Sequence, residues 1–335
     1  MKEPLEPLRF ERHFVEKVWG GRALATRPGI ELPPDVPIGE TWEIVDRGEE
    51  NSVVALGAFQ GRTLRELMEE RASEILGTAR PAKGGRFPLL VKYIDATQDL
   101  SVQVHPDDDA AASIGGDAEA KTEAWYVLDS AAGGCVYAGL DPTVERDEFE
   151  SIADGPGVVD ALQRFEVEAG DCVLVRGGTV HAIAAGVSIL EVQQNSDTTY
   201  RLYDWGRVGL DGKPRETHVR RALASVRFGE DVRPRRPEWR PSEEEGEGAL
   251  ERAELARSDV FGMDGLRLTA AVAMPADTVC HIYSVVRGSG RLSLGSSERS
   301  WPLATGDVWL VPAACGAARL EPAGGTLEVV DMYPR

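Results

Sequence analysis

The feature that most constrains the fold is a succession of short β-rich runs, each broken within a few residues by glycine, proline or aspartate. These runs cover residues 52–56, 89–94, 101–104, 124–128, 172–175 and 188–193, and then 266–273, 279–286, 290–294, 308–311 and 327–331. Strands this short and this often interrupted are typical of sandwiches and barrels rather than of parallel sheets. Helical spacing is limited to residues 63–76, 107–112, 145–153 and 158–165. The sequence therefore predicts a mainly β protein with a small helical portion.

The charge of the chain limits its partners. The 335 residues carry a formal net charge of -19, with 56 acidic against 37 basic side chains. Such a surface repels nucleic acid and anionic membranes, so neither is expected as a partner. No run approaches the roughly 18 apolar residues of a membrane span, and the first residues do not have the pattern of a signal peptide. We expect a soluble cytoplasmic protein in which an anionic substrate needs a local basic pocket.

The four cysteines indicate a reducing compartment. They are widely spaced and include no CxxC pair, at Cys135, Cys172, Cys280 and Cys315. We interpret them as reduced thiols in the core, with disulfides as the alternative.

A proline-rich charged segment suggests a domain boundary. Residues 233–248, RPRRPEWRPSEEEGEG, have no apolar periodicity and are predicted to be an exposed linker. We therefore expect a metal-binding catalytic unit over residues 1–232 and a second, metal-free unit over residues 249–335. A long surface loop within one domain is the alternative.

A faint internal repeat supports two units. Each copy places a Gly-Asp turn before an apolar strand, in EVEAGDCVLVRGGTVHA (residues 166–182) and PLATGDVWLVPAACGAA (residues 302–318). Aligning the turns places His181 opposite Ala317. Aligning Tyr126 with Tyr283 places Glu123 opposite Cys280. The sequence therefore predicts two similar β units, with polar groups kept in the first.

Three side chains from separate β runs form a candidate metal site. Strand alternation in SVQVHPD puts Gln103 and His105 on one face. Glu123 opens the run TEAWYVL, and His181 follows the turn GGT. Two imidazoles, a carboxylate and an amide oxygen suit a borderline divalent ion such as zinc and leave room for water or substrate. Taken singly, each histidine is more simply a buried, hydrogen-bonded side chain. His13, His218 and His281 are expected to be structural.

Further polar groups accompany the candidate ligands. Lys121 stands two residues before Glu123 and shares its face in an extended segment. If residues 191–207 stay extended, one face carries Glu191, Gln193, Asn195, Asp197, Thr199 and Arg201. Such a face is either a solvated surface or the lining of a wet pocket, and Tyr203 and Trp205 favour the pocket.

Several motifs resemble the class I mannose-6-phosphate isomerases, in their shorter bacterial form. They lie between residues 14 and 223, and only a generic cupin-like pattern remains after residue 241. They are VWGG (18–21), GETWEI (39–44), PLLVKYIDATQDLSVQVHPDD (88–108), KTEAWYV (121–127), GTVHAI (178–183) and the stretch 191–207. The resemblance implies a double cupin, that is, two jelly-roll β-barrels, and one zinc ion per chain. The implied zinc ligands are Gln103, His105, Glu123 and His181.

The resemblance also implies interconversion of mannose 6-phosphate and fructose 6-phosphate through a cis-enediol. Its active-site arginine and lysine fall on Arg201 and Lys121, with a matching acid at Asp197. Arg201 is expected to stabilise the enediolate or orient the substrate, because it keeps its proton. The base stays open among Lys121, Glu191 and Asp197. Longer members have a histidine, implicated in ring opening, where this chain has Ala120.

Other points stay open at this stage. Lys92 and Arg207 are weak candidates for binding the phosphate. The rival interpretations are an iron-dependent cupin oxygenase and a sugar-binding cupin that keeps its metal without catalysis. The chain is expected to act as a monomer or a homodimer.

Overall fold

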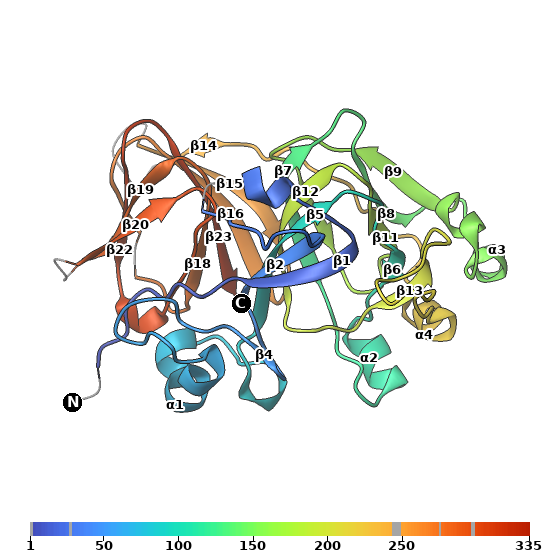
Figure 1. Ribbon diagram of the computed structural model, residues 1–335, viewed down its shortest axis with the longest axis horizontal. Coiled ribbons are helices and arrows are strands. Elements are labelled where there is room, and N and C mark those ends of the chain that lie inside the picture. The colour runs from blue at the N-terminus through green and yellow to red at the C-terminus, as the bar shows by residue number, and fades with distance from the viewer. Residues whose placement is uncertain (1–2, 27–28, 243–248, 275, 296–298) are drawn as a thin grey trace.

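Two β-barrels stand side by side in the computed structural model (Figure 1). The structure describes residues 3–26, 29–242, 249–274, 276–295 and 299–335. Within these residues every strand pairing is antiparallel, which the short connections between strands allow. The prediction of a mainly β fold with a small helical portion is confirmed.

The first barrel is built from two sheets. Its six-stranded sheet has the order β1 (His13–Gly21), β2 (Ile38–Ile44), β5 (Leu89–Ala96), β12 (Val187–Gln194), β7 (Glu123–Ser130), β10 (Cys172–Val175). Its five-stranded sheet has the order β13 (Tyr200–Tyr203), β6 (Val102–Val104), β11 (His181–Ile183), β8 (Cys135–Leu140), β9 (Leu162–Glu166). A separate two-stranded sheet joins β3 (Asp46–Arg47) and β4 (Glu50–Asn51).

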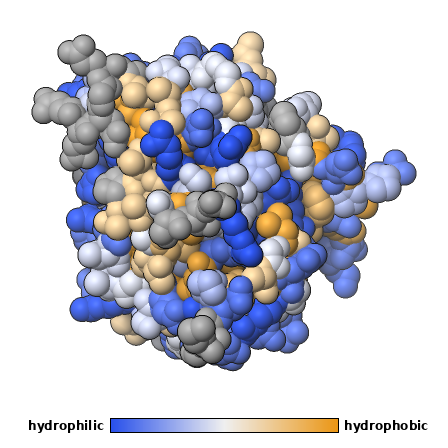
Figure 2. Space-filling model, turned by 90° about the vertical axis from the view of Figure 1, so that its left-hand side faces the viewer, coloured by the Kyte–Doolittle hydropathy of each residue, from blue (hydrophilic) through white to orange (hydrophobic). Residues whose placement is uncertain are grey.

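The second barrel repeats this plan. Its six-stranded sheet has the order β14 (Arg240–Pro241), β15 (Leu250–Arg257), β16 (Phe261–Leu268), β23 (Leu327–Pro334), β18 (His281–Arg287), β21 (Val308–Val311). Its four-stranded sheet has the order β17 (Val272–Met274), β22 (Ala318–Pro322), β19 (Ser289–Leu294), β20 (Ser300–Ala304). The surface on this side of the molecule mixes hydrophilic and apolar residues (Figure 2).

The strand registers identify equivalent positions in the two barrels. The Val127 amide donates to the Asp171 carbonyl at 2.8 Å, and the Val285 amide donates to the Asp307 carbonyl at 2.9 Å. Counting back from these valines makes His281 the counterpart of Glu123. The expected pairing of Glu123 with Cys280 was therefore wrong by one residue, because the two tyrosines used for that alignment are not equivalent.

The outer faces of the two six-stranded sheets pack against each other and against helix α1 (Leu64–Leu76). This shared core contains Val91, Leu190 and Ala124 from the first barrel. Two buried hydrogen bonds join the sheets: Tyr93 Oη to Ser284 Oγ at 2.8 Å and Tyr126 Oη to Glu328 Oε1 at 2.9 Å. Each barrel also has its own apolar interior. The metal-site strands are thus supported from behind by the second barrel.

Most of the predicted helices are present. Helix α1 begins after Thr63, whose hydroxyl accepts from the Glu66 amide while Glu66 accepts from the Thr63 amide, in a capping box. Helices α2 (Asp108–Ile114) and α3 (Arg146–Ile152) match two further predictions. Helix α4 (Val219–Ser225) was not predicted.

Three predicted elements differ from the structure. The β run predicted at residues 52–56 forms only isolated bridges, at Val53 and Val54. Residues 158–165 do not form a helix, because a 3₁₀ turn (Pro156–Val159) leads into strand β9, which pairs with β8. Val158 and Leu162 have the spacing of one helix face, but Val158 is buried in the 3₁₀ turn and Leu162 is buried in strand β9. The predicted strand 266–273 is divided between β16 and β17.

The linker prediction concerns residues that are only partly described. Residues 243–248 lie outside the described residues, while Cys172 and Arg235 exchange two backbone hydrogen bonds, of 2.9 and 2.8 Å. The division at 1–232 and 249–335 stays a prediction. All four cysteines are free, and three of them are buried. No described helix is long and apolar enough to cross a membrane, and a cytoplasmic location stays a prediction.

Candidate metal centre and active site

Three neighbouring strands bring the predicted metal ligands together. Gln103 on β6 pairs directly with His181 on β11, and Glu123 begins β7 in the facing sheet. His105 follows β6 by one residue. One donor atom from each of His105, Glu123 and His181 lies within 4.8 Å of the others. This is the one such group of three among the described residues, and all three are buried.

Both histidines are oriented as ligands. His105 Nδ1 donates to the Thr198 carbonyl and His181 Nδ1 donates to the Thr179 carbonyl, each at 2.9 Å. These bonds fix the tautomer and leave each Nε2 lone pair facing Glu123, at 3.4 Å from its oxygens. Burial, and then Lys121, lowers the pKa of His105 to about 3, and burial also lowers the pKa of His181. Both rings are therefore neutral, as a metal ligand must be.

Glu123 is the charged member of the group. Burial alone would raise the pKa of this carboxyl, but Lys121 and then His105 outweigh burial and hold the pKa well below its ordinary value. Its Oε1 accepts from Trp125 Nε1 at 3.1 Å. Its Oε2 is buried and accepts no hydrogen bond from a described residue, although Lys121 Nζ lies 2.8 Å away. A buried oxygen in this state fits a site made for a cation.

Gln103 completes the group when its amide is turned. Its Nε2 lies 3.2 Å from His181 Nε2, and its Oε1 accepts from Ser101 Oγ at 3.1 Å. The two ends of an amide are assigned from hydrogen bonding. Rotating the amide of Gln103 by 180° lets Nε2 donate to Ser101 Oγ and directs Oε1 towards the ligand atoms of His105, Glu123 and His181.

Three lysines and three glutamates line the floor of the site in alternation. Lys17 Nζ lies 3.3 Å from Glu40, and Lys92 Nζ lies 3.7 Å from Glu40 and 3.2 Å from Glu191. Lys121 Nζ lies 4.0 Å from Glu191 and 2.8 Å from Glu123. Their charges cancel, so any bound divalent cation makes this part of the site positive.

The same contacts shift individual groups. Burial, and then the nearby Glu123, raises the pKa of Glu191. Burial also acts to raise the pKa of Glu40, but Lys92 and Lys17 outweigh it and lower that pKa to about 2. Burial acts to lower the pKa of Lys92, but Glu191 and Glu40 outweigh it and raise that pKa.

A pocket of about 300 Å³ opens above these groups. Its lining includes Gln103, Lys121, Glu123, His181 and Glu191, together with Asp197, Thr199 and Arg201. Asp197 is exposed at the rim. Arg201 Nη1 donates to the Glu216 carbonyl at 2.7 Å, and its buried Nε has no partner among the described residues. Burial, and then Arg215, lowers the pKa of Arg201.

The extended face predicted for residues 191–207 is only partly present. Strand β12 ends at Gln194, and the chain turns before β13 begins at Tyr200. Asn195 therefore points away from the pocket, where its Nδ2 donates to the carbonyls of Asp46 and Phe87.

The two phosphate candidates have different positions. Lys92 lines the pocket, whereas Arg207 is outside the lining and pairs with Asp204 at 2.8 Å. Arg215, which the sequence did not single out, lines the pocket and also pairs with Asp204. Lys17, Glu40 and Trp42 were missed as well. Of the motifs quoted above, GETWEI contains two of these residues, Glu40 and Trp42.

A family model for the catalytic domain of type I phosphomannose isomerase matches residues 8–136. The mannose-6-phosphate isomerase ManA of Bacillus subtilis is 36% identical over 316 residues, covering 94% of this chain and 96% of the relative. The chain belongs to the mannose-6-phosphate isomerase family. It is therefore an isomerase, and the family resemblance of its motifs is confirmed.

Solved structures of family members share the fold. A crystal structure of the mannose 6-phosphate isomerase from Bacillus subtilis superposes with a TM-score of 0.86 at 31% identity, covering 98% of this chain and 99% of that one. A putative mannosephosphate isomerase from Archaeoglobus fulgidus gives a TM-score of 0.77 at 26% identity, covering 99% of each chain. The double-cupin prediction for this chain is confirmed.

Proposed function

We propose that this isomerase interconverts mannose 6-phosphate and fructose 6-phosphate through a cis-enediol, with one zinc ion per chain. The observation that carries the proposal is the charge pattern of the site. Two buried lysines and the partly exposed Lys17 cancel three buried glutamates, so a divalent ion on His105, Glu123 and His181 leaves a positive pocket inside an acidic protein. Such a pocket favours a small anionic substrate.

The donor set supports zinc. Two neutral imidazoles, one carboxylate and the Gln103 amide oxygen offer borderline ligands around a small centre. A bound zinc ion would supply Lewis-acid polarisation of the open-chain carbonyl and its neighbouring hydroxyl. The chain's own residues must then hold the substrate and move the proton between C1 and C2.

Glu191 is our choice for the proton transfer. Its carboxylate is buried and lines the pocket between Lys92 and Lys121, whereas Asp197 lies exposed at the rim. The raised pKa of Glu191 brings its proton affinity closer to what a shuttle at neutral pH needs. Lys121, 2.8 Å from Glu123, can donate to a substrate oxygen that becomes negative.

Two arginines line the pocket at different positions. Arg201 and Arg215 both line it, and Asp204 is the one carboxylate that pairs with Arg207 and Arg215 among the described residues. The excess positive charge of Arg207 and Arg215 can bind a dianion, whereas Arg201, whose Nε has no partner among the described residues, pairs with Gln103 beside the candidate metal ligands. Arg201 therefore orients the substrate and stabilises the enediolate. Arg215 replaces Arg207 as our phosphate candidate.

Residues of the site argue against the two rival functions. A redox-active iron site is disfavoured by the Gln103 amide, because oxygenases commonly use a further histidine at such a position. A cupin that only binds sugar has no need for buried Glu191 beside two lysines. These groups cost free energy to bury and are most useful for proton transfer.

One experiment tests the proposal. The purified protein is analysed for bound metal and assayed with mannose 6-phosphate, with fructose 6-phosphate detected by a coupled enzyme. We expect about one zinc per chain, activity that chelation abolishes, and recovery on adding zinc. Zinc-loaded protein that does not turn over mannose 6-phosphate would refute the substrate assignment, and bound iron with oxygen consumption would support the oxygenase.

A further inference from the structure

A second and larger cavity lies between the two barrels, apart from the metal site. Its volume is about 890 Å³, within the range of small-molecule sites. The walls come from the segment 78–88, helix α2 with the residues after it, the end of β12, the β15–β16 turn and the C-terminal residues. Neither the candidate metal ligands nor the pocket-lining lysines belong to it.

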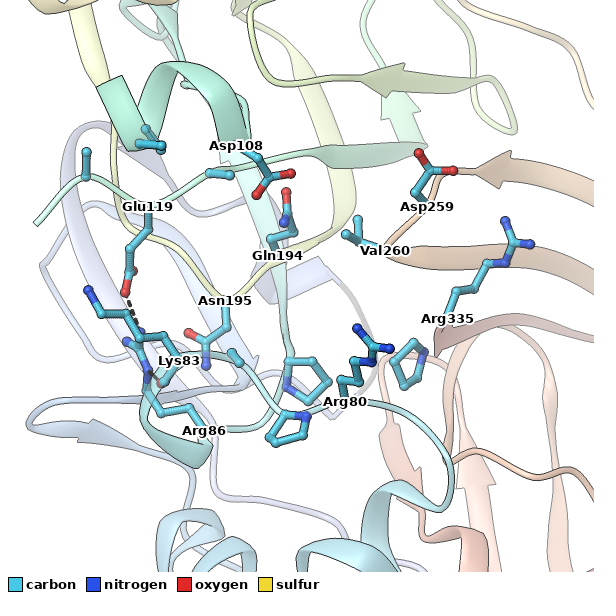
Figure 3. Close-up of a pocket in the computed structure, with 18 of the residues that line it drawn as sticks. Arg80, Lys83, Arg86, Asp108, Glu119, Gln194, Asn195, Asp259, Val260 and Arg335 are labelled. Carbon is cyan, nitrogen blue, oxygen red and sulfur yellow. Dashed lines mark hydrogen bonds and ion pairs between the residues drawn. The ribbon is translucent and has the colours of Figure 1, made fainter. Parts of the chain in front are cut away.

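The two long sides of this interbarrel cleft differ in charge. Arg80, Lys83 and Arg86 lie along one side, and Asp108 and Asp259 lie along the opposite side, where Arg335 lies near Asp259 (Figure 3). Arg86 pairs with Glu119. Within the described residues, Arg80 and Lys83 make no ion pair, although acidic residues outnumber basic ones in the chain. The basic side therefore has charge available for a ligand.

The three basic residues are joined by a glycine turn whose glycines lie outside the lining of the cleft. Residues 80–86 read RPAKGGR, and both glycines have positive φ, of 75° and 74°. A Cβ atom at Gly84 would meet no other atom within 4 Å. The turn places the side chains of Lys83 and Arg86 on the cleft, where they can donate charge-assisted hydrogen bonds to phosphate oxygens.

The remaining walls are apolar or accept hydrogen bonds. Pro81, Pro88, Ala112 and Val260 supply apolar surface, and Asp108 and Asp259 make no ion pair with a described residue. From these features we propose that the interbarrel cleft binds a small phosphorylated molecule. The phosphate of the ligand contacts the basic side, and the apolar part of the ligand packs against the alanine and the prolines. Hydroxyl or amino groups of the ligand donate to Asp108 and Asp259.

Two residues of the cleft wall are hydrogen-bonded to residues that support the metal site. Glu119 lines the cleft, and its amide donates to Thr198 Oγ1 at 3.0 Å, while the Thr198 carbonyl accepts from His105. Gln194 also lines the cleft, and its Oε1 accepts from the Thr122 amide at 2.7 Å, between Lys121 and Glu123. A ligand that contacts these two side chains therefore acts on the supports of the metal site. The cleft ligand is accordingly a regulator, a role that rests on the proposed isomerase function.

Binding is tested on the zinc-loaded protein by isothermal titration. AMP and glucose 1-phosphate serve as separate probes, because one carries a nucleoside body and the other a sugar body. We expect one of them to bind with a Kd below about 1 mM. The double variant Arg80→Gln, Lys83→Gln should bind it at least about tenfold more weakly, and Ala112→Trp should abolish binding by filling the cleft.

Matched substitutions outside the cleft control for general effects. Ser113→Trp places the same ring on the same helix, and Arg319→Gln removes an exposed arginine of the second barrel. Both should bind as the wild type does. Failure of both probes to bind, or equal binding by Ala112→Trp, would overturn the cleft site, whatever the isomerase assay gives.

The regulatory role has its own measurement. Saturating the cleft should change kcat/KM for the sugar phosphate at least about twofold in the wild type and leave Ala112→Trp unaffected. A wild-type kcat/KM that does not respond to a bound probe would overturn the regulatory role and leave the binding site intact.

Discussion

Replacing Glu191 with glutamine tests the proton shuttle directly. The side chain is 2% exposed, and the amide has the same shape as the carboxylate, so the strand can keep its register. The change removes one proton-accepting group without touching a candidate metal ligand. Because general acid–base catalysis contributes about 10²- to 10⁴-fold, we expect kcat to fall by at least about 100-fold.

The cost in stability follows from the ion pairs that are lost. Glu191 lies 3.2 Å from Lys92 and 4.0 Å from Lys121. At an effective dielectric constant of about 20, these attractions amount to about 5 and about 4 kcal/mol before solvation is considered. Most of this is offset, because a buried charge no longer needs desolvation and each lysine keeps a second glutamate. We expect the free energy of unfolding to fall by about 2 kcal/mol.

A matched variant separates an effect on kcat from an effect on the free energy of unfolding. Glu43 is also a buried glutamate, 2.6 Å from Arg12, but it does not line the pocket. Glu43→Gln should lose a similar amount of stability in urea unfolding and keep its kcat. For Glu191→Gln, zinc content should stay at about one per chain. A kcat within about threefold of the wild type, with normal zinc, would refute the assignment of Glu191.

Three further predictions concern other groups. Removing a direct metal ligand in His181→Ala should weaken zinc binding by more than about 100-fold, since changes one shell further out already cost 10- to 100-fold; an unchanged zinc stoichiometry after dialysis would remove His181 from the ligand set. Arg201→Ala should lower kcat by about 100-fold or more at normal zinc content, and normal turnover would exclude Arg201 from transition-state stabilisation. Burial acts to lower the pKa of His281, but Asp331 at 2.9 Å and then Asp277 outweigh it and raise that pKa. The stabilisation is therefore complete below the unfolded pKa near 6.5 and is lost as pH rises through the higher folded pKa. His281→Gln should then lower the free energy of unfolding, measured in urea, by more at pH 6 than at pH 9, and a pH-independent difference would contradict this.

The sequence indicated which side chains come together at the candidate metal site, because its signals are local. Gln103 and His105 share a face by simple strand alternation, and the runs that carry Glu123 and His181 are recognisable strands. The family motifs then indicated that His105 and His181 belong to the same site. The barrels were predictable for the same reason, since each strand is bounded by its own turn residues.

The missed parts depend on contacts between distant segments. Lys17 and Glu40 join the site through the pairing of β1, β2 and β5, and no short-range pattern predicts that pairing. Arg215 reaches the pocket from a loop by pairing with Asp204. The counterpart of Glu123 was misplaced by one residue, because only interstrand hydrogen bonds determine which residues are equivalent.

The back-to-back packing of the two large sheets has a consequence for how the site can change. On β5 and β12, the residues on both sides of Lys92 and Glu191 face the second barrel and are fully buried, as is Ala124 beside Glu123 on β7. A slip of one residue along any of these strands would push a charged group into the apolar core between the sheets and bring an aliphatic or aromatic side chain to the candidate metal site. Packing on both faces of these strands therefore allows only one strand register at the site. New specificity is more easily reached through the loops that carry Asp197 and Arg215 than through these strands.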